Sequence, residues 1–551
     1  MRNIFLFFFL LEVVSADAQK IKKEDKQLIS NLQKHIEVLA SDSMEGRRAG
    51  TPGEQKASAY INNEFKNIGL LPKGTNDYYQ PFEIDEGKQI GSATRFIVGG
   101  QPLLLNEHFI PLAFSANVNI EALPSLAIQE VGMPWFIDLK DTMEANDARN
   151  PHFDIYTIIK AKAKEIKAKG ATVLFLYNTS EAKDNIAFVS KDRSEPASIP
   201  VVYITDEGVK KFFNDPQATL DINMKIDIIP KKRSGRNVVG FIDNKAKNTI
   251  IIGAHFDHLG YGEDGNSLDR GSKQVHNGAD DNASGVAGMI ELARMLKASS
   301  LKQNNYLFVA FSAEELGLLG SKYFVQNPTI DLSSANFMVN LDMIGRVNDA
   351  NPTLTVGGFG TSPAWSTTFA SSGKKGIYKG SLLFKFDSSG TGPSDHTSFY
   401  LKGIPVLFYF SGTHSDYHKP TDDINKINFP GEMRVIKHVY SVVELANTNN
   451  SKLAFTKTKE TASTIASFSV TLGIMPDYSF NGSGVRVDAI SENRPAQKAG
   501  LQPGDVITQL GNHNVTSLEN YMQALGEFKK GDKTIVHFNR INEKLSAPVE
   551  F

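Results

Sequence analysis

A series of apolar runs between residues 250 and 346, each followed by acidic or histidine residues, constrains the fold more than any other feature. The runs at 250–254, 306–311 and 337–341 are short and apolar, as buried strands are. Residues 286–296, between the first two runs, have helical periodicity. Strands alternating with helices predict an α/β fold with a doubly wound, mostly parallel sheet. The polar groups would then collect at the carboxyl-end rim, where such sheets bind ligands.

Length and composition limit the class of protein. At 551 residues the chain is too long for one hydrophobic core, and about 150 residues per domain predicts roughly three or four domains. The net charge of −2 argues against a nucleic-acid partner, because such proteins usually carry a basic surface. The chain contains no cysteine, which excludes disulfides and thiolate metal ligands.

Residues 1–18 are predicted to be a secretory signal peptide. Arg2 precedes the apolar run 4–11, and Ala16-Asp17-Ala18 has the small-x-small pattern of a cleavage site. A membrane anchor is the alternative, but a span needs about 20 apolar residues, far more than this run supplies. We therefore expect an exported protein, periplasmic or extracellular, with no stable membrane anchor.

Changes in pattern along the chain predict the domain boundaries. The α/β domain is expected to be discontinuous, formed by residues 19–92 and 236–449, with a β-rich insert at 93–235. Residues 450–467 are rich in Thr, Ser, Lys and Asn and indicate a linker. Residues 468–551 then form a compact C-terminal domain.

The insert contains a lysine-rich helix over 155–169, which ends at Gly170 and leads into a strand. This pattern resembles the protease-associated domain inserted in many secreted exopeptidases. The resemblance implies a lid or a substrate-guiding module.

The C-terminal domain contains Pro495-Ala496-x-x-Ala499-Gly500-Leu501-x-Pro503-Gly504-Asp505. This stretch resembles the PDZ domains attached to bacterial proteases. The resemblance implies that Leu472, Gly473 and Ile474 form a loop that grips the carboxylate at a peptide C-terminus. The alternative is a PDZ domain that only packs against the catalytic domain.

A catalytic metal in a chain without cysteine must be bound by His, Asp and Glu, which suit zinc and harder cations. The candidates at strand ends, or just beyond them, are His255, Asp280, Glu315, Asp342 and His418. Two cations that share one carboxylate explain why so many acids gather, because the acids repel one another without them. We expect Asp280 to be shared, which leaves Glu314 as the general base.

Several motifs together resemble the co-catalytic di-zinc exopeptidases, the family of secreted leucyl aminopeptidases and glutamate carboxypeptidase. They are His255-x-Asp257, Gly278-Ala279-Asp280-Asp281-Asn282-Ala283-Ser284-Gly285, Ala313-Glu314-Glu315-x-Gly317, Asn340-Leu341-Asp342-x-x-Gly345 and Tyr417-His418-x-Pro420-x-Asp422.

The resemblance implies two Zn²⁺ per chain, one bound by His255, Asp280 and Asp342, the other by Asp280, Glu315 and His418. It also implies a cis Asp280–Asp281 peptide bond. The residues implied to support the metal ligands or to contact substrate are Asp257 (beside His255), Asp281, Asp395, Asp416 and Tyr417.

Three local points stay open or rest on composition. His258 or His276 could replace a predicted histidine ligand, although the strand ends at His255. The Gly- and Asp-rich segment 260–275 is read as a plain solvated loop rather than a calcium site. The segment around Arg47 and Arg48 is likewise read as a solvated loop rather than a cap over the active site.

These observations predict a zinc aminopeptidase that removes N-terminal residues from peptides. A carboxypeptidase or dipeptidase would need a cationic pocket, for which Arg346, Arg47 and Arg48 are the obvious donors. From another class, a metal-free peptide-binding scaffold would use the PDZ domain alone. Free-amino against N-acetylated peptides, and zinc content with hydrolysis before and after chelation, separate these hypotheses.

Overall fold

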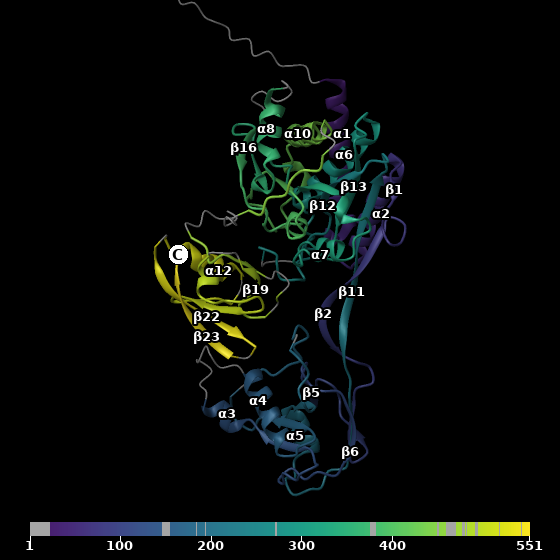
Figure 1. Cartoon of the computed structure of the whole chain (residues 1–551). Helices are drawn as coiled ribbons and strands as arrows, with labels where there is room; N and C mark the ends of the chain where they lie inside the picture. The colour runs from purple at the N-terminus through teal and green to yellow at the C-terminus, as the bar shows by residue number, and fades with distance from the viewer. Residues whose placement is uncertain are drawn as a thin grey trace, which may run out of the picture. The chain divides into compact units, whose positions relative to one another are not determined.

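The structure is a computed structural model of the whole chain, shown in Figure 1. It describes residues 22–551 apart from 146–154, 183, 193, 270–272, 375–381, 449–450, 459–469, 477–479, 481, 491–493, 517, 530 and 542. The predicted signal peptide and most of the predicted linker lie outside the described residues. Among the described helices, none is long and apolar enough to cross a membrane.

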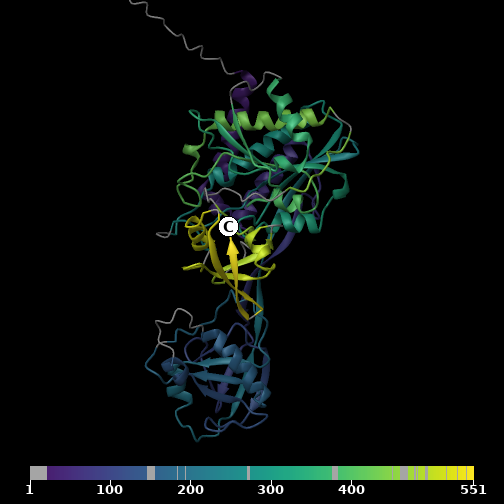
Figure 2. The same ribbon diagram turned by 60° about the vertical axis from the view of Figure 1, so that its left-hand side comes forward.

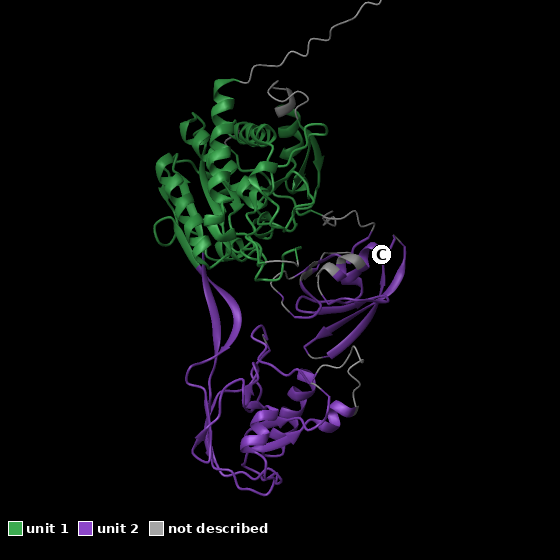
Figure 3. Ribbon diagram, turned by 180° about the vertical axis from the view of Figure 1, so that it is seen from behind, with its two compact units in different colours: residues 1–81, 236–467 green, residues 82–235, 468–551 purple. Residues whose placement is uncertain are grey.

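The chain divides into two compact units, coloured separately in Figure 3. The first contains residues 1–81 and 236–467, and the second contains residues 82–235 and 468–551. The first unit is discontinuous in sequence, and the division assigns residues 82–92 to the second unit with the insert.

A nine-stranded mixed sheet forms the centre of the first unit, in the order β1-β11-β13-β12-β14-β17-β15-β16, with β2 paired to β11. Strands β13, β12, β14 and β17 are parallel neighbours. The bounds are β1 Leu71–Pro72, β2 Tyr79–Ile90, β11 Ile228–Ile242, β12 Asn248–His255, β13 Asn304–Phe311, β14 Ala335–Leu341, β15 Thr353–Gly357, β16 Leu383–Phe386 and β17 Val406–Phe410. Every residue of β12, β13 and β14 is buried, which explains why most of their residues are apolar.

Helices cover both faces of this sheet, so the predicted doubly wound α/β fold is confirmed. On one face Ile250, Ile252 and Phe308 pack into a core with helices α1, α2, α6 and α10. On the other face Ile251 and Leu307 pack with α7 and α9. The helices are α1 Lys23–Leu39, α2 Pro52–Ile68, α6 Gly285–Ala298, α7 Leu319–Gln326, α8 Ala364–Lys374, α9 His396–Tyr400 and α10 Phe429–Ala446.

The insert has two four-stranded sheets, β4-β3-β10-β6 and β5-β9-β8-β7. The predicted lysine-rich helix is present as α4, and Gly170 follows it with φ 101°. The elements are β3 Arg95–Val98, β4 Gln101–Pro102, β5 Phe109–Pro111, β6 Val118–Ala122, β7 Trp135–Asp138, α3 Lys140–Ala145, α4 Ile155–Ala168, β8 Leu174–Tyr177, β9 Val201–Ile204, α5 Asp206–Phe212 and β10 Ile222–Ile226.

The C-terminal domain, yellow in Figure 2, has a sheet in the order β18-β19-β20-β22-β23, with β21 paired to β20. Gly500 and Gly504 of its sequence motif have φ of 76° and 93°, which a side chain would oppose. The elements are β18 Ile474–Pro476, β19 Val485–Ile490, α11 Pro495–Lys498, β20 Val506–Leu510, β21 His513–Asn514, α12 Leu518–Gly526, β22 Lys533–Arg540 and β23 Glu543–Glu550.

Candidate metal centre

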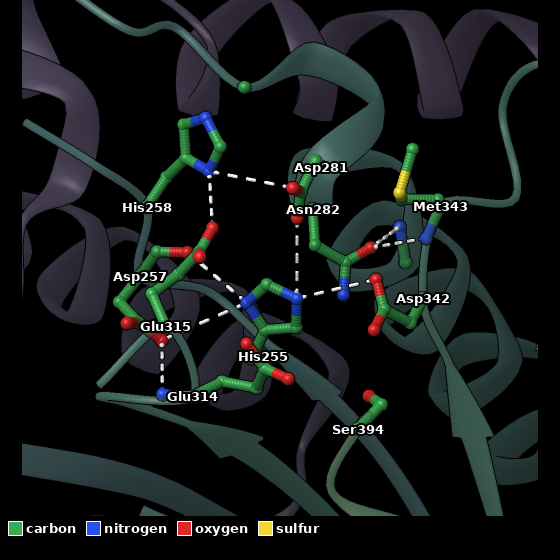
Figure 4. Close-up of polar contacts among 12 residues, drawn as sticks. His255, Asp257, His258, Asp281, Asn282, Glu314, Glu315, Asp342, Met343 and Ser394 are labelled. Carbon is green, nitrogen blue, oxygen red and sulfur yellow. Dashed lines mark hydrogen bonds and ion pairs between the residues drawn. The ribbon is translucent and has the colours of Figure 1, made fainter. Parts of the chain in front are cut away.

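The ends of three parallel strands bring the predicted metal ligands together. His255 is the last residue of β12, Glu314 and Glu315 follow the end of β13, and Asp342 follows β14. Ala313 has φ 57°, so the chain turns directly after β13 and the two glutamates do not simply alternate along a strand. Figure 4 shows His255 at the centre of the resulting cluster.

The first group of potential ligands consists of His255, Asp281 and Asp342. His255 Nε2 lies 3.3 Å from Asp342 Oδ1 and 3.4 Å from Asp281 Oδ1. Ligand atoms about 2.1 Å from a tetrahedral zinc ion are about 3.4 Å apart, so these spacings suit zinc.

The second group lies on the other side of Asp281. His418 Nε2 is 3.4 Å from Asp281 Oδ2 and 3.2 Å from Glu315 Oε2. His258 is also a potential ligand here, because ligand atoms of His258, Asp281 and Glu315 lie within 4.8 Å of one another. Its Nδ1 donates to Glu315 Oε1 at 2.8 Å. The two carboxylate oxygens of Asp281 therefore face different histidines, His255 and His418.

The shared position is held by Asp281, so the prediction that Asp280 bridges the two sites is wrong. Asp280 Oδ1 instead accepts from Gly345 N at 2.7 Å and from Ser284 Oγ at 3.0 Å, and its Oδ2 lies 3.2 Å from His414 Nε2. The predicted cis bond is also displaced by one residue, since it joins Asp281 to Asn282. Both aspartates stand in one irregular turn, where the backbone does not follow a period that sequence could reveal.

Hydrogen bonds fix the orientation of both histidines that flank Asp281. His255 Nδ1 donates to the carbonyl of Asp257 at 3.2 Å, and His418 Nδ1 donates to the carbonyl of Asn266 at 3.0 Å. Each bond leaves Nε2 to face the carboxylates, as expected of a metal-ligating imidazole. The expected orienting residue Asp257 does lie beside His255, with its carboxylate Oδ1 further away, at 3.8 Å.

The electrostatics of the cluster show that the residues compensate one another strongly. Although burial lowers the pKa of His255, the carboxylates of Glu314 and Asp342 raise it well above its usual range. Although burial raises the pKa of Glu315, His418 and His258 lower it well below its usual range. Imidazoles and carboxylates thus offset one another in this cluster, a role that divalent cations can take over. The donor set fits zinc, since it is rich in imidazole and carboxylate.

Glu314 differs from its neighbour Glu315. Burial raises its pKa well above the usual range, and the carboxylates of Asp342 and Glu315 raise it further. Its backbone N–H donates to Asp257 Oδ1 at 3.1 Å, which fixes the residue beside His255 (Figure 4). A carboxylate with a raised pKa next to a metal centre is suited to proton transfer.

The remaining predicted residues have different surroundings. Asp395 is buried, and burial raises its pKa to about 7. The ring of Tyr417 stacks on that of His418, with centroids 3.9 Å apart. Asp416 pairs with Lys426 and with Arg346, whose Nη2 is 2.9 Å from Asp416 Oδ2.

Arg47 was missed by the sequence analysis, which assigned it to a solvated loop. It is 0% exposed, and its guanidinium donates four hydrogen bonds, to the carbonyls of Leu39, Phe256, Asn277 and Gly278. Two of these carbonyls immediately precede the turn that carries Asp281, and Phe256 follows His255. The glycine at position 46 is the one sign in the sequence that this segment is packed closely. Its φ is 62°, and a Cβ at this position would lie 2.5 Å from the Gly260 oxygen, so only glycine fits.

Comparisons with known proteins match two segments of the chain. Residues 237–443 match the model of peptidase family M28, and residues 454–551 match the PDZ domain model. Aminopeptidase YwaD of Bacillus subtilis (strain 168) is 29% identical over 434 residues, which cover 75% of this chain and 84% of that protein. An aminopeptidase of Pseudomonas aeruginosa (strain UCBPP-PA14) is 25% identical, over 59% of this chain and 58% of its own length.

Among solved structures, BSAP, a zinc aminopeptidase from Bacillus subtilis, aligns with 23% identity and a TM-score of 0.42, over 77% of this chain and 98% of that one. The two family models confirm the expected resemblances for residues 237–443 and 454–551. The protein carries a peptidase domain of family M28, at residues 237–443, followed by a PDZ domain.

Proposed function

We propose that the protein is an exported di-zinc aminopeptidase that releases N-terminal residues from peptides. The observation that carries the proposal is the placement of Asp281, whose two carboxylate oxygens face His255 and His418 at 3.4 Å each. In this proposal one zinc ion is held by His255, Asp281 and Asp342, and the other by Asp281, Glu315 and His418. Two such ions polarise the substrate carbonyl and lower the pKa of water.

Glu314 is the proposed general base. It takes a proton from the attacking water and delivers it to the leaving amine, and burial raises the pKa of its carboxyl group, which favours proton uptake. His258 is assigned a supporting role, because its Nδ1 donates to Glu315 Oε1 and so holds that carboxylate in place.

The state of the arginines favours an aminopeptidase over a carboxypeptidase. A carboxypeptidase needs a cation for the substrate carboxylate. Arg346 is paired with Asp416, Arg47 donates to four backbone carbonyls, and Arg48 is paired with Asp264. The acid-rich site instead suits the ammonium group at a peptide N-terminus, and both curated relatives described above are named aminopeptidases.

The decisive experiment measures zinc per chain and hydrolysis in the same preparation. We expect two zinc ions per chain, cleavage of aminoacyl p-nitroanilides, and no cleavage of their N-acetylated forms. Chelation should remove the activity and zinc should restore it. Cleavage of N-acetylated peptides from their C-terminus would identify a carboxypeptidase, and no metal-dependent hydrolysis would leave the scaffold hypothesis.

A second function is proposed for the PDZ domain, namely binding of a peptide C-terminus. Strand β18 pairs with β19 on one side and lies at the edge of its sheet, where a peptide strand can add. Leu472 and Gly473 precede this strand and Ile474 is its first residue, and the side chain of Arg494 lies against Gly473. Binding of peptides with free and amidated C-termini to the full chain tests this proposal, since only the free carboxylate should bind.

A further inference from the structure

The segment 260–269, which we call the strap, makes three hydrogen bonds to proposed ligands of the second zinc site. His418 Nδ1 donates to the carbonyl of Asn266 at 3.0 Å, and the Leu268 N–H donates to the carbonyl of His418 at 2.9 Å. Asn266 Nδ2 also donates to the carbonyl of Glu315 at 3.3 Å. The strap therefore holds both the ring and the backbone of His418. This part of the segment is not the plain solvated loop that composition predicted.

The bond from the His418 ring is the one with chemical consequences. A histidine that donates from Nδ1 is fixed in the tautomer whose Nε2 is free to bind a metal, and its ring cannot rotate without breaking the bond. In this orientation Nε2 lies 3.4 Å from Asp281 and 3.2 Å from Glu315. Displacement of the Asn266 carbonyl would release the ring from that position.

Arg48 contacts the two acidic residues of the strap, Asp264 and Glu263. Arg48 Nε donates to Asp264 Oδ2 at 2.8 Å and Nη2 donates to Oδ1 at 2.7 Å, a two-pronged pair. The two side chains are only 16% and 15% exposed, so solvent screens this pair less than a surface pair. Glu263 lies 3.9 Å from the same guanidinium.

Backbone contacts place Arg48 and the start of the strap side by side. The N–H of Gly260 donates to the carbonyl of Gly46 at 3.0 Å, and the N–H of His258 donates to the carbonyl of Arg47 at 3.3 Å. Arg47 and Arg48 thus have separate tasks. Arg47 braces the turn before the shared Asp281, whereas Arg48 reaches the strap that supports His418.

We propose that Arg48 and Asp264 are positioning residues for the second zinc ion, acting through the strap on His418 and Glu315. This inference rests on the proposed two-zinc function. Loss of the pair should weaken binding of the second ion by about 10–100-fold, the usual effect of removing an outer partner of a ligand. Binding of the first ion, at His255 and Asp342, should change by less than about twofold.

The test compares Arg48→Gln, Asp264→Asn and the double variant in the full chain, by zinc titration calorimetry and by zinc content in zinc-buffered dialysis. Each single variant should bind the first zinc ion as tightly as the wild type and the second more weakly. The double variant should bind the second ion no more weakly than the single variants do, because the two residues act as one unit. Arg48→Lys, which keeps the charge but not the fork, should show a smaller loss and guards against failure of a harsher variant to fold.

The matched control is Arg434→Gln with Asp349→Asn, a pair in the same unit whose Nη2–Oδ1 distance is 2.6 Å. It should leave both affinities unchanged. If the wild type binds two zinc ions and the strap variants bind both as tightly, or lose both equally, the strap proposal fails alone. If the wild type binds fewer than two ions, the two-zinc function fails and the strap proposal fails with it.

Discussion

Replacement of Arg47 by methionine should destabilise the catalytic unit severely. The fully buried guanidinium donates four hydrogen bonds of 2.6–2.9 Å. In the variant the carbonyls of Leu39, Phe256 and Asn277 lose their donor, whereas the carbonyl of Gly278 keeps the bond from the Ala283 N–H at 3.2 Å. Each bond to a charged group contributes about 1.5–3 kcal/mol, and each buried carbonyl left unpaired costs about 1–3 kcal/mol.

The desolvation of the buried guanidinium offsets part of the stabilisation that these hydrogen bonds provide. Burial lowers the pKa of Arg47 to about 10, although Asp281 and Asp257 raise it, so the charge is held against a desolvation penalty. Methionine relieves that penalty. Three unpaired carbonyls at about 1–3 kcal/mol each, less the relieved desolvation, give an expected net loss of about 3–5 kcal/mol in the free energy of unfolding.

The assay is urea unfolding of the zinc-free protein, followed by tryptophan fluorescence. The chain has two tryptophans, so a Trp135→Phe background leaves Trp365, buried in the catalytic unit, as the only reporter. Arg434→Met is the control and should cost less than about 1 kcal/mol, because its ion pair is partly exposed. An Arg47→Met loss as small as the control's would refute the bracing role.

Three further predictions concern the metal centre and its support. Asp281→Asn should lower the affinity of both zinc ions, whereas Asp280→Asn should spare at least one, as measured by zinc content; the reverse result would restore Asp280 as the bridge. Glu314→Gln should lower kcat by about 10²–10⁴-fold with unchanged zinc content, and normal turnover would remove it as the base. Burial raises the pKa of Glu54 from 4.5 to about 7, so its protonated form stabilises the fold fully below pH 4.5 and this contribution is lost as the pH rises through 7. Glu54→Gln should therefore flatten the fall in unfolding free energy of the zinc-free protein between those pH values, and an unchanged slope would contradict the shift.

The strand ends could be predicted from sequence because burial imposes a simple pattern. Strand β12 is buried on both faces, so it is apolar up to His255, where the chain leaves the sheet. Strand β14 is buried throughout as well, although Asn336 and Asn340 interrupt its apolar residues before Asp342. Parallel strands then bring their ends to one rim, and no further information is needed to place these ligands together.

The choice between Asp280 and Asp281 could not be predicted in this way. The two residues are chemically identical and adjacent, in a turn that has neither helical nor strand periodicity. Their different roles come mainly from partners distant in sequence, since Gly345 donates to Asp280 together with the nearby Ser284, whereas His255 and His418 face Asp281.

Arg47 and Arg48 were misread for a related reason. On composition alone, a segment with arginines between glycines is interpreted as a solvated loop. Arg47 nevertheless donates hydrogen bonds to carbonyls that are 209 to 231 residues away in the sequence. The positive φ of Gly46 and its close approach to Gly260 require glycine there, but they are seen only in the folded chain. The sequence itself shows no more than a glycine at this position.

The close approach of Gly46 to Gly260 has a consequence for protein engineering. A Cβ at Gly46 would lie 2.5 Å from the Gly260 oxygen, so even one methyl group would push the two segments apart. The region matched by the peptidase family starts at residue 237 and therefore omits the arginines that brace its own active site. A chimera or truncated protein that begins at residue 237 would contain every proposed ligand. It should still bind zinc weakly, unless residues 22–81, which contain α1 and α2, are included.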